Sequence, residues 1–199
     1  MVEPVYLTFD DGPDPYWTPR VLDMLARHEV MATFFMIGQH ALAHPDVVRA
    51  VAAAGHGIGN HTFSHRHPWR IREADARREV RDGTEVLQDI CDRPVTLFRP
   101  PYGRTRACMV AEAARCGQTQ CLWDRSTVDW GPFGGRSWIA RRLAKVQPGE
   151  IVLMHDGAGA YNRPADLLQA LPVLLRRLGA AGMRFGVARS GPQADLSTR

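Results

Sequence analysis

The sequence predicts an α/β protein: a small, distorted (β/α)7 barrel with mostly parallel strands, which need not close completely. Seven short apolar runs typical of β-strands alternate with amphipathic helical patterns over 199 residues. Such alternation indicates parallel strands joined by crossover helices. The length suits one buried core. Polar clusters follow the apolar runs, where α/β folds place their functional groups. A doubly wound open sheet is the alternative.

The predicted strands are short segments rich in β-branched and aromatic residues. They cover residues 5–9, 33–37, 57–60, 96–99, 119–123, 151–154 and 184–187. The chain contains no internal repeat and no linker rich in Pro, Gly or Ser before its end. We therefore expect a single domain over residues 1–189 and a frayed tail over residues 190–199.

The predicted helices have apolar residues spaced to form one buried face. They cover residues 18–28, 45–54, 73–91, 106–116, 138–146 and 165–181. In the second of them, Val47, Val48 and Val51 share a face; in the third, Val80 and Leu87 do. The stripes of Leu and Val predict core packing rather than ligand binding.

The composition excludes several classes of protein. With 45% apolar and 23% charged residues, the chain is neither disordered nor of low complexity, and no apolar run approaches the roughly 18 residues of a membrane span. Lys and Arg number 25 against 21 acids, and Lys145 is the only lysine. The arginines are scattered beside acidic residues, which is typical of a solvated surface, so no nucleic-acid partner is expected. We expect a monomer.

Cysteine spacing and the start of the chain bear on the compartment. Cys91, Cys108, Cys116 and Cys121 form no CxxC pair, and we expect free thiols. Strand-like residues begin almost at Met1, which leaves no room for a signal peptide. If Met1 is the native start, a cytoplasmic location is expected. If a leader has been removed, the expected location is extracellular or in the cell wall.

Two of the polar clusters contain residue types that bind metal ions. The first strand ends in Asp10-Asp11, followed by Gly12-Pro13, and the third leads into His61 and His65. Alone, Asp-Asp-Gly is most often a turn, and an isolated pair of histidines is more often a surface feature. At adjacent strand ends, two histidines and a carboxylate can hold Zn²⁺ with open positions for water and substrate.

Three further strand ends supply acid–base groups. Arg99 precedes Pro100-Pro101, which fixes the backbone and lets the arginine pair with a buried carboxylate. Asp129-Trp130 follows the fifth strand and His155 ends the sixth. A second carboxylate can act as a base and another histidine as an acid, so the five clusters together predict metal-assisted hydrolysis.

These five motifs, in this order, resemble the polysaccharide deacetylases of carbohydrate esterase family 4, the NodB homology domain. The resemblance covers residues 4–188. It implies a distorted (β/α) barrel that removes acetyl groups from polymers of N-acetylglucosamine, or from O-acetylated xylan in one branch. An N-acetylated glycan is then the expected partner. One divalent metal ion is the expected cofactor, most simply Zn²⁺, with Co²⁺ and Ni²⁺ as alternatives.

The resemblance also implies roles for the metal and base residues. Asp11, His61 and His65 match the family's metal ligands. Asp10 matches the general base that deprotonates the attacking water, and Arg99 matches the arginine that orients this base.

The remaining motifs match the acid and the walls of the site. His155 matches the general acid that protonates the leaving amine, and Asp129 matches the carboxylate that holds it. Trp130 and Leu153 match the apolar walls around the acetyl methyl group. The backbone N–H of Tyr102 matches a donor to the oxyanion.

Four positions at the edges of these motifs complete the comparison. Pro101 is expected to line the substrate site, and Thr62 matches the hydroxyl that steadies the histidine loop. The fourth motif often reads Asp-x-x-Asp-Trp, but Ser126 stands at the first Asp position, and Asp124 lies two residues earlier. Because Asp129-Trp130 is intact, we expect an effect on the loop rather than loss of activity.

Two alternatives to a de-N-acetylase remain. The same residues serve an O-acetyl esterase acting on acetylated, xylan-like glycans. A catalytically inactive glycan-binding module is disfavoured because no metal ligand or base is missing. Chain length and linkage of the glycan depend on loops, of which residues 66–72 and 131–136 are our candidate subsite walls.

Overall fold

The computed structural model describes residues 3–189. Its strands are β1 (Tyr6–Asp10), β2 (Ala32–Met36), β3 (Gly57–Asn60), β4 (Leu97–Phe98), β5 (Thr119–Gln120), β6 (Arg125–Ser126) and β7 (Ile151–His155). Its α-helices are α1 (Trp17–Arg27), α2 (Gly38–Ala43), α3 (Pro45–Ala53), α4 (Glu73–Cys91), α5 (Ala107–Arg115), α6 (Arg136–Leu143) and α7 (Pro164–Ala180). Two 3₁₀ turns are η1 (Pro68–Arg70) and η2 (Pro101–Gly103).

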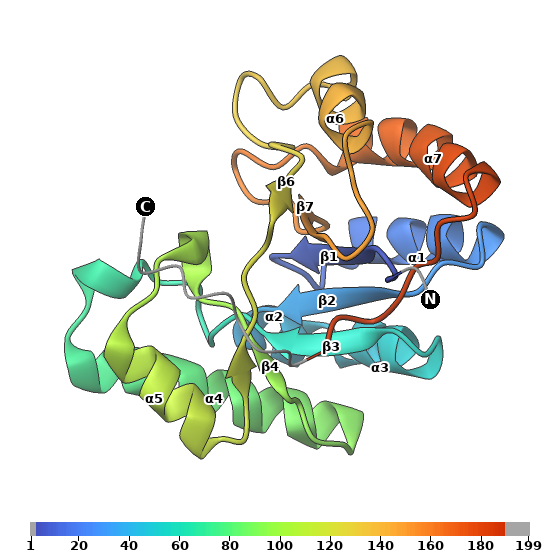
Figure 1. The fold of residues 1–199 in the computed structure, drawn as a ribbon. Coiled ribbons are helices and arrows are strands. Elements are labelled where there is room, and N and C mark those ends of the chain that lie inside the picture. The colour runs from blue at the N-terminus through green and yellow to red at the C-terminus, as the bar shows by residue number, and fades with distance from the viewer. Residues whose placement is uncertain (1–2, 190–199) are drawn as a thin grey trace.

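All seven strands belong to one parallel sheet, in the order β5-β4-β3-β2-β1-β7-β6. Written cyclically, this is the strand order of a β/α barrel, interrupted between β5 and β6. A doubly wound sheet would reverse its order at the centre. The predicted incomplete (β/α)7 barrel is therefore confirmed, as a curled half-barrel with helices packed around the strands (Figure 1).

The two edges of the sheet are close together because consecutive strands form them. Four residues, 121–124, connect β5 to β6, and five extended steps span at most about 18 Å. The backbone N–H of Cys121 donates to Phe98 O on the β4 side, and that of Asp124 donates to Ile151 O on the β7 side. This connecting segment lies along the opening of the half-barrel.

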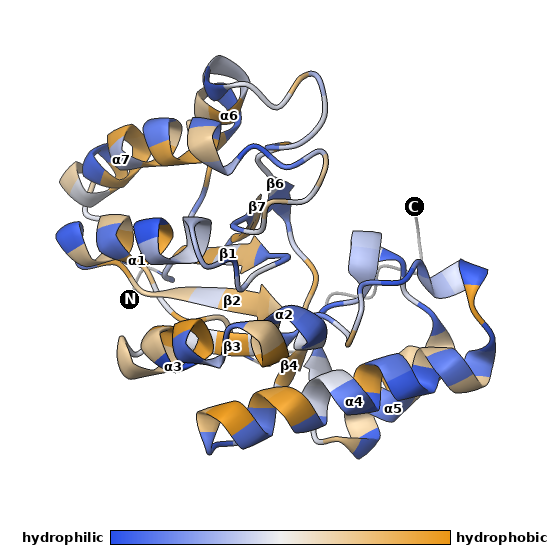
Figure 2. Cartoon of the chain, turned by 180° about the vertical axis from the view of Figure 1, so that it is seen from behind, coloured by the Kyte–Doolittle hydropathy of each residue, from blue (hydrophilic) through white to orange (hydrophobic). Residues whose placement is uncertain are grey.

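Side chains alternate between two cores. On β1, Leu7 and Phe9 pack with the surrounding helices, whereas Tyr6 packs inside the barrel with Phe35 and Leu97. Both long helices α4 and α7 carry hydrophobic and hydrophilic bands (Figure 2). The same alternation directs Thr8 and Asp10 toward the barrel interior with Tyr6. The polar groups at the carboxyl end of the sheet thus lie next to a hydrophobic layer inside the barrel.

The structure corrects two strand predictions. Residues 184–187 do not form a ladder but make a single parallel bridge between Val5 and Phe185, and their backbone covers the amino end of the barrel. The strand expected at 119–123 ends at Gln120, since the chain bends there, and β6 then pairs with β7. Two-residue β6 is too short to show a sequence period.

The six predicted helices agree with the structure to within three residues at every end. Helix α2 was not expected, because its six residues are too few for an amphipathic pattern. Among residues 3–189, no helix is both long enough and apolar enough to cross a membrane. The four cysteines are free thiols, as expected. The predicted tail, residues 190–199, lies outside the described part of the chain.

Candidate metal and catalytic site

The carboxyl ends of the parallel strands bring the predicted residues to one edge of the sheet. The strand register pairs Asp10 with His155, at the ends of β1 and β7. Asn60 pairs with Phe98, so the following residues, His61 and Arg99, are also neighbours. Residues far apart in the sequence therefore meet because of strand pairing, and side-chain alternation turns them to the same side.

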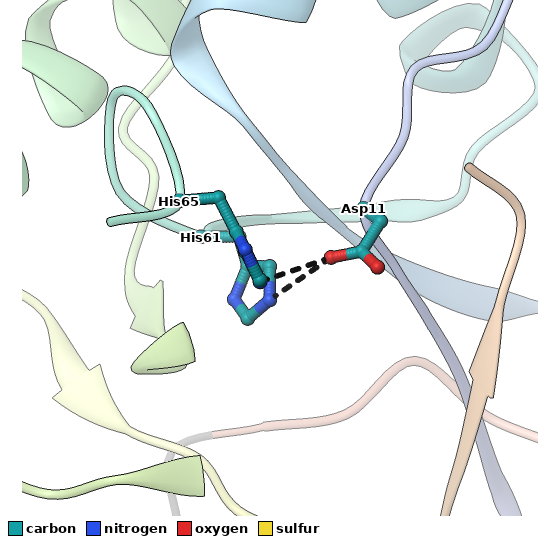
Figure 3. Close-up of side chains that lie close together, drawn as sticks. All are labelled: Asp11, His61 and His65. Carbon is teal, nitrogen blue, oxygen red and sulfur yellow. Dashed lines mark ion pairs between the residues drawn. The ribbon is translucent and has the colours of Figure 1, made fainter. Parts of the chain in front are cut away.

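Asp11, His61 and His65 form the cluster at the centre of this edge (Figure 3). Asp11 Oδ1 lies 3.5 Å from His61 Nε2 and 3.2 Å from His65 Nε2, and one ligand atom from each residue lies within 4.8 Å of the others. Asp11 Oδ1 is buried and has no hydrogen-bond partner among the described residues. A cation between the three side chains would satisfy this oxygen.

The surroundings of the cluster fit a divalent metal ion. His61 Nδ1–H donates to the Arg99 carbonyl at 2.7 Å, which leaves Nε2 to act as a ligand. The Thr62 hydroxyl accepts from the His65 backbone N–H at 3.2 Å and steadies the turn between the histidines. Two imidazoles and one carboxylate are a common set for catalytic zinc, with coordination positions left open. The predicted metal residues are thus brought together.

Burial and mutual charges shift the pKa values of the three clustered residues in different directions. Burial raises the pKa of Asp11, but the nearby His61 and its charge outweigh this and hold the pKa well below its usual range. Burial and the charge of His61 lower the pKa of His65 to about 4, so this ring is neutral near pH 7. Burial opposes protonation of His61, but Asp10 and Asp11 raise its pKa overall. Asp11 and His65 are therefore in the protonation states that metal binding requires, whereas His61 would release a proton when a metal ion binds.

Asp10 and Arg99 form a buried ion pair beside the cluster. Arg99 Nη1 lies 2.7 Å from Asp10 Oδ1 and also donates to Thr8 Oγ1 at 2.8 Å. The other guanidinium nitrogens donate to the carbonyls of Cys121 and Leu122, at 2.8 and 2.9 Å. The Arg99 side chain is fully buried. The guanidinium holds Oδ1 of the Asp10 carboxylate, while Oδ2 of the same carboxylate lies 3.7 Å from His61 Nε2.

His155 and Asp129 form a second pair on the other side of the cluster. Asp129 Oδ1 lies 3.0 Å from His155 Nδ1, and the Thr127 hydroxyl donates to the same oxygen at 2.8 Å. Burial lowers the pKa of His155, but the charge and hydrogen bond of Asp129 raise it to about 9. His155 is therefore an imidazolium near pH 7, with Nε2 free to donate a proton. Trp130 packs edge-on against its ring.

The other predicted residues also lie at or near this edge. The Tyr102 ring is 4.8 Å from the ring of His65, and its backbone has a left-handed φ of 59°. Such strained backbone is often retained at functional sites. Pro101 is buried in η2, and Leu153 is buried on β7 next to His155.

Ser126 and Asp124, the two residues at or near the first Asp position of the fourth motif, have different surroundings in the structure. Asp124 binds the Ile151 backbone N–H at the far end of β7 and plays no part in the site. Ser126 Oγ accepts from the backbone N–H of Val128, which has a left-handed φ of 54°. Ser126 thus holds the turn that presents Asp129, in line with the expected effect on the loop.

The structure adds a support for the histidine loop that the sequence did not reveal. Glu79 of α4, 7% exposed, accepts from the backbone N–H of Ser64 at 2.7 Å and from its hydroxyl at 2.5 Å. Asn60 Oδ1 accepts from Thr62 N–H at 2.8 Å. A Cβ at Gly83 would lie 2.6 Å from Asn60 Oδ1, so this glycine lets the loop approach α4 closely. Glu79 had no local signal, since it lies within a charged helical run.

A cavity of about 410 Å³ opens beside the metal cluster on the α2 side. Asp11 and His65 form part of its wall, and the side chains around the rest include Gln39, His40, His44 and Asp14. His40 is exposed, and its Nδ1–H donates to the Asp11 carbonyl at 3.0 Å. The candidate subsite loops carry exposed aromatic rings, Trp69 and Phe133.

Fold and site together define a β/α half-barrel with a carboxylate–histidine cluster that could hold a metal ion, between an Asp–Arg pair and an Asp–His pair. The chain belongs to the polysaccharide deacetylase family, whose model matches residues 2–121. It is 39% identical to a chitooligosaccharide deacetylase of Rhizobium leguminosarum bv. trifolii over 194 residues, covering 95% of this chain and 90% of the relative.

Two further relatives agree. A peptidoglycan-N-acetylglucosamine deacetylase of Bacillus cereus is 34% identical over 181 residues, covering 91% of this chain and 65% of the relative. The solved structure of a family 4 carbohydrate esterase from Streptomyces lividans in complex with acetate superposes with a TM-score of 0.84 at 31% identity, covering 94% of each chain. The resemblance drawn from the five motifs is thus confirmed.

Proposed function

We propose that this protein is a metal-dependent hydrolase that removes N-acetyl groups from oligo- or polysaccharides containing N-acetylglucosamine. The observation that carries the proposal is the convergence of three units at one sheet edge: the Asp11–His61–His65 cluster, the Asp10–Arg99 pair and the His155–Asp129 pair. The first can hold a metal ion, the second a base and the third an acid. Metal-assisted hydrolysis of an amide can use all three.

Asp11, His61 and His65 would hold the metal ion. When bound, a divalent ion supplies a Lewis acid that polarises an acetyl carbonyl and makes a water molecule more acidic. Zn²⁺ fits the ligand set best, and Co²⁺ and Ni²⁺ are accepted by similar sites. The unpartnered Asp11 Oδ1 supports this assignment.

Asp10 acts as the general base. The attacking water forms a bond to the carbonyl carbon and gives its proton to the Asp10 carboxylate. Arg99 keeps this carboxylate in place, through a contact of 2.7 Å. The two prolines after Arg99 and the strained turn at Tyr102 support a role for the Tyr102 backbone N–H in stabilising the oxyanion.

His155 acts as the general acid. When the carbon–nitrogen bond breaks, the nitrogen takes the proton of the imidazolium, and the products are acetate and a free amine. A pKa of about 9 keeps this proton available at neutral pH. Trp130 and Leu153, both next to His155, together with Pro101, would form the apolar walls for the acetyl methyl group.

The substrate class follows from the relatives, which include deacetylases of chitooligosaccharides and of peptidoglycan N-acetylglucosamine. We propose that the same residues act on such a glycan in this chain, and that residues 1–189 form a single deacetylase domain. The exposed rings of Trp69 and Phe133 are suited to stacking against sugar rings.

The test is an acetate-release screen on chitooligosaccharides of graded length, peptidoglycan and acetylated xylan. We expect release from the first two substrates, its loss on removal of metal by a chelator, and its recovery on addition of Zn²⁺. Asp10→Asn is the control for the base. Activity confined to acetylated xylan would instead identify an O-acetyl esterase. Full activity of Asp10→Asn, or activity that survives complete metal removal, would overturn the mechanism.

A further inference from the structure

Asn162 contacts Asp11 Oδ2, the carboxylate oxygen of Asp11 that faces away from the two histidines. Its Nδ2 lies 2.7 Å from Asp11 Oδ2, while Asp11 Oδ1 faces His61 and His65. The same Nδ2 reaches the Gly157 carbonyl at 3.1 Å. The two oxygens of Asp11 therefore have different partners, an amide on one side and two imidazoles on the other.

The position of Asn162 is built by a short antiparallel pairing of two loops. Trp130 and Asn162 form a bridge, and the backbone N–H of Gly131 donates to Tyr161 O at 2.8 Å. The backbone N–H of Arg163 donates to Asp129 O at 2.9 Å. These bonds all use the backbone, which leaves the Asn162 amide free to point at Asp11.

The loop before Asn162 is shaped to bring the amide close. The Asn162 backbone N–H donates to Gly159 O at 3.0 Å. A Cβ at Gly159 would lie 2.9 Å from Asn162 Nδ2, and one at Gly157 would lie 2.4 Å from the Asp11 carbonyl oxygen. Side chains at these two positions would therefore push the loop away from the metal ligand.

We infer that Asn162 is a positioning residue that sets the rotation of the Asp11 carboxylate and reserves Oδ1 for the metal ion. The amide nitrogen can only donate hydrogen bonds, so the oxygen it contacts is already engaged and faces a partial positive charge. Oδ1 is left as the oxygen that a cation can approach. Groups of this kind behind a ligand orient it and tune metal affinity. The inference rests on the metal site of the proposed function.

The inference is tested by Zn²⁺ affinity, measured by competition with a chromophoric chelator on the full chain. Asn162→Ala removes the amide, and Asn162→Leu keeps much of its shape without a donor. We expect both to bind Zn²⁺ about 10 to 100 times more weakly than the unmodified protein. The visible spectrum of the Co²⁺-loaded protein should change in intensity, since the carboxylate is released. Tyr161→Ala is the matched control, because its ring is 75% exposed and only its backbone joins the pairing.

Each outcome decides the inference. Variants that bind Zn²⁺ within twofold of the unmodified protein, with an unchanged Co²⁺ spectrum, would overturn it and leave the proposed function intact. An equal loss in Tyr161→Ala would also overturn it, by making the loop backbone responsible. So would failure of both Asn162 variants to fold, measured by circular dichroism, since Asn162 would then belong to the fold. If the unmodified protein bound none of Zn²⁺, Co²⁺ and Ni²⁺, the proposed function itself would fail.

Discussion

Both carboxylate oxygens of Asp129 engage the same residue, His155. Oδ2 accepts from the His155 backbone N–H at 2.8 Å, and Oδ1 lies 3.0 Å from Nδ1 of its ring. The end of β7 and the orientation of its imidazole are therefore fixed by one fully buried side chain. The charge of that side chain also decides the protonation state of the ring.

The first prediction concerns the pH dependence of catalysis. An acid must carry its proton, so activity should fall as the pH rises through the His155 pKa of about 9. In Asp129→Asn the charge is lost while burial still lowers the pKa. The alkaline limb of kcat/KM should then move to lower pH by about one to three units. The measurement is the pH profile on a chitooligosaccharide.

Asp124→Asn is the control for this shift. Asp124 lies just before β6 and Asp129 just after it, but the Asp124 side chain binds the Ile151 backbone N–H, which an amide oxygen can also do. Its profile should match that of the unmodified protein. An alkaline limb that stayed in place in Asp129→Asn would show that His155 is not the group titrating there.

The second prediction separates the acid from the rest of the machinery. His155→Ala should slow amide cleavage by about 10²–10⁴-fold. It should slow cleavage of an activated acetate ester, such as p-nitrophenyl acetate, far less, because that leaving group departs without a proton. The ratio of the two rates on one preparation removes errors in active concentration. Equal losses on both substrates would argue against the acid role.

The third prediction concerns the buried arginine. Arg99→Ala leaves the Asp10 carboxylate buried without its partner, which typically costs about 3–5 kcal/mol. Urea unfolding of the metal-free protein should show a loss of this size. Arg99→Lys keeps the charge but not the planar fork, so its loss should be intermediate. Arg27→Ala, an exposed site on α1, should stay within about 0.5 kcal/mol of the parent.

The fourth prediction concerns the docking of the histidine loop on α4. Glu79→Ala leaves the partly buried Ser64 N–H without its acceptor, which should cost about 1 kcal/mol, the low end of the range for an unsatisfied buried donor. Because Ser64 precedes the ligand His65, Zn²⁺ affinity should fall as well, and Glu79→Gln should lose less because it keeps one acceptor. Glu85→Ala, exposed on the same helix, is the control. Unchanged Zn²⁺ affinity in Glu79→Ala would mean that the loop holds its shape without α4.

Local patterns were sufficient for the fold and for the principal site residues. Strand periodicity and the polar residues that follow each strand can be recognised within a few positions of sequence. Parallel pairing then brings the carboxyl ends of these strands to one edge of the sheet. This is why Asp10, His61 and His155 could be expected at one edge. The error at 184–187 has the same origin: Phe185 and Val187 alternate like strand residues, yet they have almost no ladder to join.

The supporting residues could not be predicted because their contacts are not local. Asn162 meets Asp11 across 151 positions of sequence, and Glu79 meets Ser64 across 15. Neither lies in a pattern that distinguishes it from a solvated polar residue. Strand register determines where the candidate metal ligands meet. Loop conformation determines which side chains form hydrogen bonds to these ligands and to their loop, and it depends on tertiary packing.

The connection between β5 and β6 has a consequence for how the molecule opens and closes. The carbonyls of Cys121 and Leu122, on this connection, hold the same guanidinium that holds Asp10. Local unfolding that detaches residues 121–124 therefore also releases the base. Amide hydrogen exchange at Cys121 and Asp124 would report this opening directly. A protein in which residues 121–124 have detached would keep Asp11, His61 and His65 together, but Asp10 would no longer be held in the orientation that we propose for proton transfer from water.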